Sequence, residues 1–181
     1  MEELDIGQSA LLTDISLCLN YYRLFTSGIY VCTNIPIRLK NEIKITPCLM
    51  SMVNHGEYKQ CEPNYKDNTF DGPPNFVIDI ESKNNLGIFQ ERKKVFEANQ
   101  VLEYLIIQDT HPLTFEWNSL KDGKYITLKA DDHGLIKSQA LPGFWISENA
   151  LKNRDWRTIM STIQFGISRK EHHDFMNTIW N

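Results

Sequence analysis

Several features that mark secreted or membrane proteins are missing from this sequence. The acidic N-terminus, residues 1–5, has no positively charged segment, and no apolar run approaches the roughly 20 residues that cross a bilayer. The four cysteines contain no C-x-x-C pair, which indicates reduced thiols and argues against a zinc site or a disulfide framework. We therefore expect a cytoplasmic protein that makes no membrane contact.

A strong charge of one sign is also absent. The chain has 19 Lys and Arg residues against 23 Asp and Glu residues, so its net charge is −4. Such a balance gives no overall basic field, and any contact with nucleic acid has to come from a local patch. With 181 residues and an ordinary globular composition, the chain is long enough to bury the core of one domain.

The apolar pattern predicts a mixed arrangement of helices and strands. Helical spacing covers residues 14–25, 86–99 and 156–163, and a further helix follows, whereas strand patterns cover residues 29–32, 35–39, 43–46, 47–53, 76–81 and 104–107. Two alternating segments flank Asp122-Gly123, which is a strong hairpin signal. We expect an α/β (α+β) fold, with a mixed sheet flanked by helices and an antiparallel meander.

Two segments lie outside this regular pattern. The polar stretch 54–73 is long for a structureless loop, so it is either a flap over a site or contains an element that the pattern does not reveal. Residues 1–150 form the main domain, and residues 151–181 form a helical appendage. Its last helix has an apolar face, which either caps the same core or makes a homodimer contact. That face consists of Phe175, Met176, Ile179 and Trp180.

The candidate functional residues lie on one strand and the helix after it. Asp79, Glu81 and Lys83 alternate along an apolar strand and therefore share one face. Two carboxylates and a cation are the residue types that metal-dependent phosphodiester cleavage needs, and Arg92 and Lys93 on the helix could add phosphate contacts. The spacing alone also fits an exposed edge strand with a Glu-Lys pair, followed by an ordinary charged helix face.

Four motifs in a fixed order carry a resemblance to a known family. They are P-N-F-V-I-D-I-E-S at residues 74–82, the helix ending V-F-E-A-N-Q-V at residue 101, the strand E-Y-L-I-I at residues 103–107, and S-Q-A-L-P-G-F-W at residues 138–145. Together they resemble the bacterial putative restriction endonuclease family of the PD-(D/E)XK nuclease superfamily, over residues 29–151. The resemblance implies a restriction-endonuclease-like fold, a DNA substrate and a Mg²⁺ or Mn²⁺ cofactor.

The residues that match the family's site are all altered. The first metal-binding aspartate of the family falls on Cys48, and a neutral thiol is a poor ligand for Mg²⁺. The family's glutamate falls on Asp79, which is one methylene shorter. Its helical lysine falls on Arg92, which can steady a phosphate but stays protonated, and its tyrosine falls on Phe96.

Two shifts along the chain could restore such a site. Glu81-Ser82-Lys83 spells the E-x-K of the superfamily, with Asp79 as second carboxylate, and Lys93 could replace the family's lysine. The leading hypothesis is a divergent metal-dependent DNA endonuclease in which Asp79 and Glu81 bind the ion and Lys83, Arg92 or Lys93 stabilises the phosphate. In this hypothesis activity is either kept or lost. The alternative is a non-catalytic module that binds nucleic acid or protein on the same fold.

Overall fold

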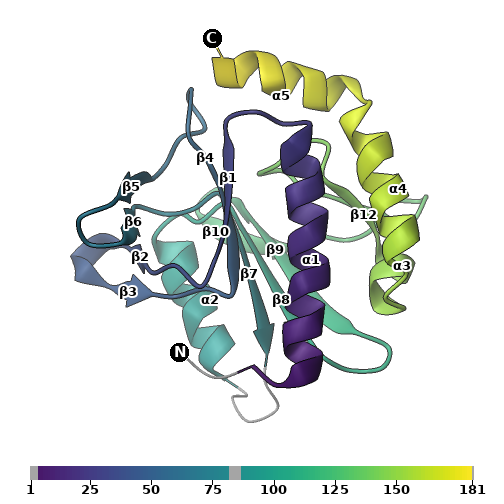
Figure 1. Cartoon of the computed structure of the whole chain (residues 1–181), viewed down its shortest axis with the longest axis horizontal. Helices are drawn as coiled ribbons and strands as arrows, with labels where there is room; N and C mark the ends of the chain where they lie inside the picture. Colours follow the sequence, from purple (N-terminus) through teal and green to yellow (C-terminus); the bar gives the residue numbers. More distant parts are fainter. Residues whose placement is uncertain (1–3, 82–86, 181) are drawn as a thin grey trace.

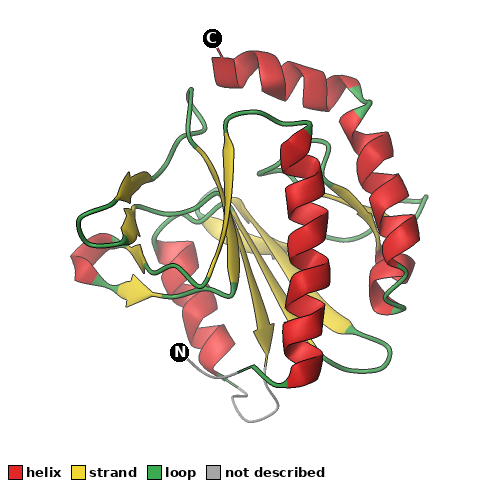
Figure 2. Ribbon diagram, viewed as in Figure 1, coloured by secondary structure: helices red, strands yellow, loops and turns green. Residues whose placement is uncertain are grey.

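The computed structural model describes residues 4–81 and 87–180, as helices, strands and turns (Figure 2). The elements of the first half of the chain are α1 (Ile6–Leu24), β1 (Ile29–Thr33), β2 (Ile37–Arg38), the 3-10 turn η1 (Lys40–Glu42), β3 (Lys44–Ile45), β4 (Leu49–Val53), β5 (Glu62–Asn64), β6 (Thr69–Asp71) and β7 (Phe76–Glu81). The second half contains α2 (Ile88–Ala98), β8 (Glu103–Gln108), β9 (Thr114–Lys121), β10 (Lys124–Thr127), β11 (Leu135–Lys137), β12 (Trp145–Ser147), α3 (Glu148–Lys152), α4 (Trp156–Ile167) and α5 (Lys170–Trp180).

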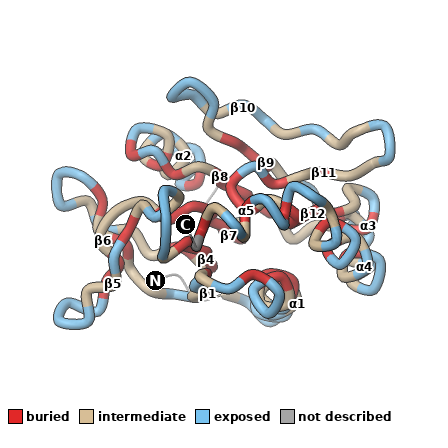
Figure 3. The backbone as a smooth tube through the Cα atoms, turned by 90° about the horizontal axis from the view of Figure 1, so that it is seen from above, coloured by how far each residue is buried: buried red, intermediate tan, exposed pale blue. Residues whose placement is uncertain are grey.

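A six-stranded mixed sheet is the centre of the fold, with strand order β1-β4-β7-β8-β9-β10. β7 and β8 are parallel and are joined through α2, whereas the other neighbours are antiparallel. α1 covers one face of the sheet and α2 the other (Figures 1 and 3). The predicted mixed sheet with flanking helices and an antiparallel meander, β8-β9-β10, is confirmed. The hairpin turn has positive φ at Asp122 (51°) and Gly123 (77°), as a tight hairpin requires.

The first helix is longer than the sequence pattern predicts. Asp5 caps its N-terminus by accepting from the Gln8 backbone N–H at 2.8 Å, while the Gln8 side chain accepts from the Asp5 N–H at 3.0 Å. This reciprocal pair satisfies two N–H groups that a helix start leaves without partners. The helix therefore begins at Ile6, and the predicted start at residue 14 is wrong because Leu11 and Leu12 extend the buried stripe toward this cap.

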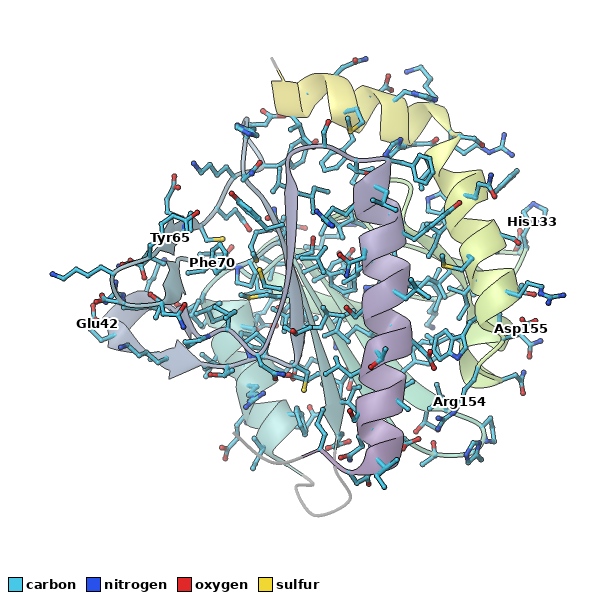
Figure 4. All side chains as sticks on the ribbon, in the orientation of Figure 1. Glu42, Tyr65, Phe70, His133, Arg154 and Asp155 are labelled. Atoms are coloured by element: carbon cyan, nitrogen blue, oxygen red, sulfur yellow. The ribbon has the colours of Figure 1, made fainter. Side chains whose placement is uncertain are left out.

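The segment 54–73 contains two strands. β5 and β6 join β2 and β3 in a small side sheet of order β3-β2-β6-β5, which lies at one edge of the molecule (Figure 1). The Arg38 guanidinium ties this sheet together through bonds of 2.9 and 2.6 Å to the Asp71 carboxylate. In Figure 4, Glu42 and Tyr65 lie toward the outer edge of this sheet, and Tyr65 is 85% exposed. Of the two alternatives for residues 54–73, the structure therefore shows the one with additional elements. The sequence pattern does not reveal β5 and β6 because these strands are too short.

Other short elements also differ from the predictions. β2 and β3 keep only two residues each of the predicted strands 35–39 and 43–46, and β11, β12 and α3 have no predicted counterpart. The predicted helix 86–99 corresponds to α2, and its first predicted residue, Leu86, lies outside the described residues. In the described chain the N-cap position of α2 is Gly87.

The C-terminal helices contribute to the main core. Ile159 and Ile163 of α4 and Phe175 and Ile179 of α5 are each at most 3% exposed and belong to the core cluster on the α1 side of the sheet. Met176 is half-buried, and the side chain of Trp180 lies outside the described part of the chain. The homodimer contact through this helix stays a prediction. Among the residues described, no helix is long and apolar enough to cross a membrane.

A buried carboxylate fastens the segment after β11 to the sheet. Glu103 of β8 is 0% exposed and accepts hydrogen bonds from Trp117 Nε1 (3.1 Å), Ser138 Oγ (2.7 Å) and the backbone N–H groups of Gln139 (2.5 Å) and Ala140 (3.2 Å). Burial raises the pKa of Glu103 to about 7, although these four donors act to lower it. The segment at residues 138–141 is therefore positioned by a single side chain of the central sheet.

Gly143, two residues after this segment, has a conformation that only glycine adopts without strain. Its φ is +92°, and a Cβ atom there would lie 2.7 Å from the Cβ of His172 in α5. The His172 ring is buried and its Nε2 lies 2.8 Å from Thr26 Oγ1, just beyond α1. The glycine thus lets the segment pass beneath the C-terminal helix at close range.

We expect Glu103 to give the protein a pH-dependent stability. Its folded pKa of about 7 lies above the ordinary value of 4.5. The contribution of the protonated Glu103 carboxyl to the stability of the folded protein is therefore complete below pH 4.5 and is lost as the pH rises through 7. Urea unfolding measures this effect at pH 5 and at pH 8. Between these pH values the free energy of unfolding of the wild type should fall by about 2 kcal/mol more than that of Glu103→Gln. Glu91→Gln, at an exposed helix position, is the control. Parallel pH profiles of wild type and Glu103→Gln would contradict this expectation.

Candidate functional site

The candidate site lies on the face of the sheet that α2 covers. Asp79 and Glu81 of β7 point to this face, because they alternate with the apolar residues that meet α1 on the other face. In the parallel pairing of β7 with β8, Asp79 lies opposite Ile106 and Glu81 opposite Gln108. The predicted sharing of one face by the two carboxylates follows from this register.

The Asp79 carboxylate is fully buried and is held by donors from three directions. Its Oδ1 accepts from the backbone N–H of Cys48 at 2.9 Å, just before β4. Its Oδ2 accepts from the Tyr104 hydroxyl of β8 at 2.9 Å and from Arg92 Nη1 of α2 at 3.0 Å. The side chain is 0% exposed, so these internal donors replace the water that a surface carboxylate would have. The carboxylate joins two strands and a helix.

Arg92 supplies the positive charge that this buried carboxylate requires. The guanidinium is 28% exposed, and its carbon lies 5.5 Å from the centre of the Phe89 ring, one turn earlier on α2. Burial acts to lower the pKa of Arg92, but the charge of Asp79 and the hydrogen bond to it raise the pKa above the ordinary value. Arg92 is therefore a permanent cation, and an ion pair with one buried member forms beneath α2.

Cys48, which the resemblance aligns with the family's first ligand, is a protonated thiol at neutral pH. Burial raises its pKa to about 12, and the negative charge of Asp79 acts in the same direction. The thiolate is the form of cysteine that binds metals. At neutral pH, Cys48 therefore contributes its backbone N–H to Asp79 and offers no charged ligand.

The remaining predicted site residues do not converge on Asp79. Glu81 is half-buried and accepts a hydrogen bond from the Gln108 side chain at the end of β8. Lys93 forms an ion pair with Glu116 of β9, two strands from β7. Lys83 lies outside the described residues. Of the predicted set, the structure brings together Asp79 and Arg92.

Tyr104 is a site residue that the sequence reasoning missed. It lies opposite Val77 on β8, two positions before Ile106, the partner of Asp79, and therefore on the same face. Its ring packs edge-on against Phe96 of α2, with ring centres 4.8 Å apart. Burial and the charge of Asp79 raise the pKa of Tyr104 well above its ordinary value, so the hydroxyl keeps its proton and donates. The usable signal was the E-Y pair at residues 103 and 104, whose two side chains face opposite sides of the sheet.

A family profile described as "Putative restriction endonuclease" (Uma2) matches residues 6–149. The chain belongs to the Uma2 family. The match includes α1, the whole central sheet and both elements that hold Asp79 and Arg92. The resemblance that the four motifs suggested is thus confirmed, and the chain is that of a nuclease-family protein.

A solved structure agrees with this assignment at the level of the fold. The crystal structure of a putative nuclease belonging to DUF820 from Anabaena variabilis ATCC 29413 matches with a TM-score of 0.62 and 10% sequence identity. The match covers 90% of this chain and 84% of that chain. A comparison with curated proteins gives no match.

The groups around Asp79 do not fit a divalent ion. Mg²⁺ needs hard oxygen ligands in octahedral geometry, usually one or two carboxylates with water. The Asp79 oxygens are occupied by N–H and O–H donors, the neighbouring position is a protonated thiol, and the adjacent cation would repel a second one. Within residues 4–81 and 87–180, no group of three or more His, Cys, Asp and Glu side chains could hold a metal ion.

Removing the Tyr104 hydroxyl should destabilise the protein by more than an equivalent change elsewhere. Tyr104→Phe leaves the buried Asp79 oxygen with one fewer donor, and hydrogen bonds to charged groups contribute about 1.5–3 kcal/mol. Tyr125→Phe is the matched control, because that hydroxyl donates to the neutral carbonyl of Val101 at 2.9 Å. In urea unfolding, Tyr104→Phe should lower the free energy of unfolding by about 2 kcal/mol and Tyr125→Phe by about 1 kcal/mol. An equal loss would mean that Asp79 does not depend on this donor.

Proposed function

We propose that this protein binds nucleic acid on a nuclease fold and does not cleave it by a metal-dependent route. The observation that carries the proposal is the Asp79 carboxylate, whose charge is balanced by Arg92 inside the protein. A carboxylate that has to hold a catalytic ion needs at least one oxygen that faces the ion. Here both oxygens of Asp79 face protein donors.

Nucleic acid is the proposed ligand because the family's description is "Putative restriction endonuclease". With a net charge of −4, binding has to rely on a local group of cations. The described part of the proposed group lies on α2, where Arg92 is partly exposed and Lys94 is exposed; Lys83 follows β7 in the sequence and lies outside the described residues. Such contacts with phosphates give weak, strongly salt-dependent binding. We place this activity in the cytoplasm, in keeping with the free thiols.

Metal-dependent DNA cleavage is the competing function, and one observation favours it. Glu81 is the last residue of β7, is half-buried, and precedes Lys83 by two residues in the sequence. In this second candidate Glu81 would hold Mg²⁺ or Mn²⁺ and Lys83 would contact the phosphate, while Asp79 and Arg92 keep their structural pair. Lys93 would then support the site from α2, where it already neutralises Glu116.

A cleavage assay separates the two functions. The purified protein is incubated with supercoiled plasmid and with single-stranded DNA in Mg²⁺ and in Mn²⁺, beside Asp79→Ala and Glu81→Ala. We expect no cleavage above the buffer control by any of the three proteins. Metal-dependent nicking that Glu81→Ala abolishes would establish the competing function and reject our proposal.

A charge-reversal pair tests the binding itself. Lys94→Glu, on the exposed side of α2, should lower the affinity for a fluorescent DNA duplex and reduce the slope of log Kd against log salt by about 1, since one phosphate contact is lost. Lys121→Glu makes the same charge change at the exposed far end of β9 and should leave the slope unchanged. Fluorescence anisotropy at several salt concentrations measures both. Equal effects of the two substitutions would reject the α2 face, and the absence of any binding at low salt would reject the nucleic-acid ligand.

A further inference from the structure

The position of Arg92 determines whether a cation can reach the Asp79 carboxylate. Its Nη1 lies 3.0 Å from the buried Oδ2 of Asp79, and the Phe89 ring lies against the guanidinium. The Asp79 side chain is 0% exposed and that of Arg92 is 28% exposed. The guanidinium therefore lies between the carboxylate and solvent, which is the side from which a solvated ion would approach.

We infer that the Arg92 guanidinium is a built-in replacement for a divalent cation, and that removing it creates a cation site at Asp79. The inference shares one premise with the proposed function, namely that Asp79 needs no metal, but it does not depend on DNA binding. It predicts that the wild-type protein ignores divalent ions at this position. It also predicts that divalent ions bind at Asp79 once the Arg92 charge is removed and residue 48 is replaced by a carboxylate.

A guanidinium suits this role for physical reasons. It stays protonated at every working pH, it is weakly hydrated, and its planar donors match a carboxylate oxygen. A lone charge in the interior is costly, so Asp79 without Arg92 needs another counter-charge. A hard divalent ion fits the oxygens that remain, which are the Asp79 carboxylate and the Tyr104 hydroxyl.

Cys48 determines how tightly such an ion could bind. Its backbone N–H is 2.9 Å from Asp79 Oδ1, so the side chain of residue 48 starts beside the carboxylate. The native sulfur atom is a soft group, whereas hard ions such as Mg²⁺ and Mn²⁺ prefer oxygen ligands. Cys48→Asp places a second carboxylate there, and two carboxylates together with water are a common ligand set for Mg²⁺ and Mn²⁺.

The test compares thermal unfolding with and without Mn²⁺ in the wild type and in Cys48→Asp/Arg92→Ala. We expect no Mn²⁺-dependent change in Tm for the wild type. The double variant should gain about 3 °C when Mn²⁺ is present at ten times its Kd. Titration calorimetry with Mn²⁺ gives the Kd, and Mg²⁺ should act in the same direction. Adding Asp79→Asn to the double variant should abolish the gain.

The matched control is Arg38→Ala, which breaks another Arg-Asp pair. Its partner Asp71 has a side chain that is 36% exposed, so water can solvate the carboxylate and no Mn²⁺-dependent gain is expected. If Cys48→Asp/Arg92→Ala does not fold, Cys48→Asp/Arg92→Met keeps the length of the side chain and removes the charge. Mn²⁺ binding by the wild type that Asp79→Asn abolishes would overturn the inference. Folded double variants that bind no Mn²⁺ would overturn it as well.

Discussion

The buried charge of Asp79 is the constraint on which this face of the protein depends. The Asp79 carboxylate has no exposed surface; β4, β8 and α2 supply its hydrogen-bond donors, and Arg92 of α2 also supplies the counter-charge. The chain reaches these positions because β7 and β8 are parallel neighbours and α2 crosses between them. The ion pair therefore joins α2 to the sheet.

A second buried carboxylate performs the corresponding task on the opposite face. Glu103 is one residue before Tyr104 on β8, so the two adjacent side chains point to different sides of the sheet. Tyr104 serves Asp79 under α2, while Glu103 holds the segment that carries Ser138. The two carboxylates differ in how they are balanced. Asp79 is paired with a guanidinium, whereas Glu103 has neutral donors and a raised pKa.

Much of the fold could be predicted from the sequence, and the site much less. Long periodic segments and the Asp122-Gly123 turn gave the central sheet and its meander, because such patterns follow directly from burial on one face. The start of α1 and the strands β5 and β6 were missed, since they depend on a local cap and on pairings between distant short segments. Spacing placed Asp79 and Glu81 on one face correctly. It could not reveal that Arg92 and Tyr104 fill the surroundings of Asp79, because that requires the register of β8 and the position of α2.

The central claim is that Arg92, and no metal ion, balances the negative charge of Asp79. The most direct measurement is a crystal structure of the wild-type protein grown or soaked with Mn²⁺, with anomalous diffraction data to locate the ion. The account predicts no anomalous peak within ligand distance of Asp79 and an intact hydrogen bond from Arg92 to its Oδ2. A peak bound to Asp79, with the guanidinium displaced toward solvent, would contradict it.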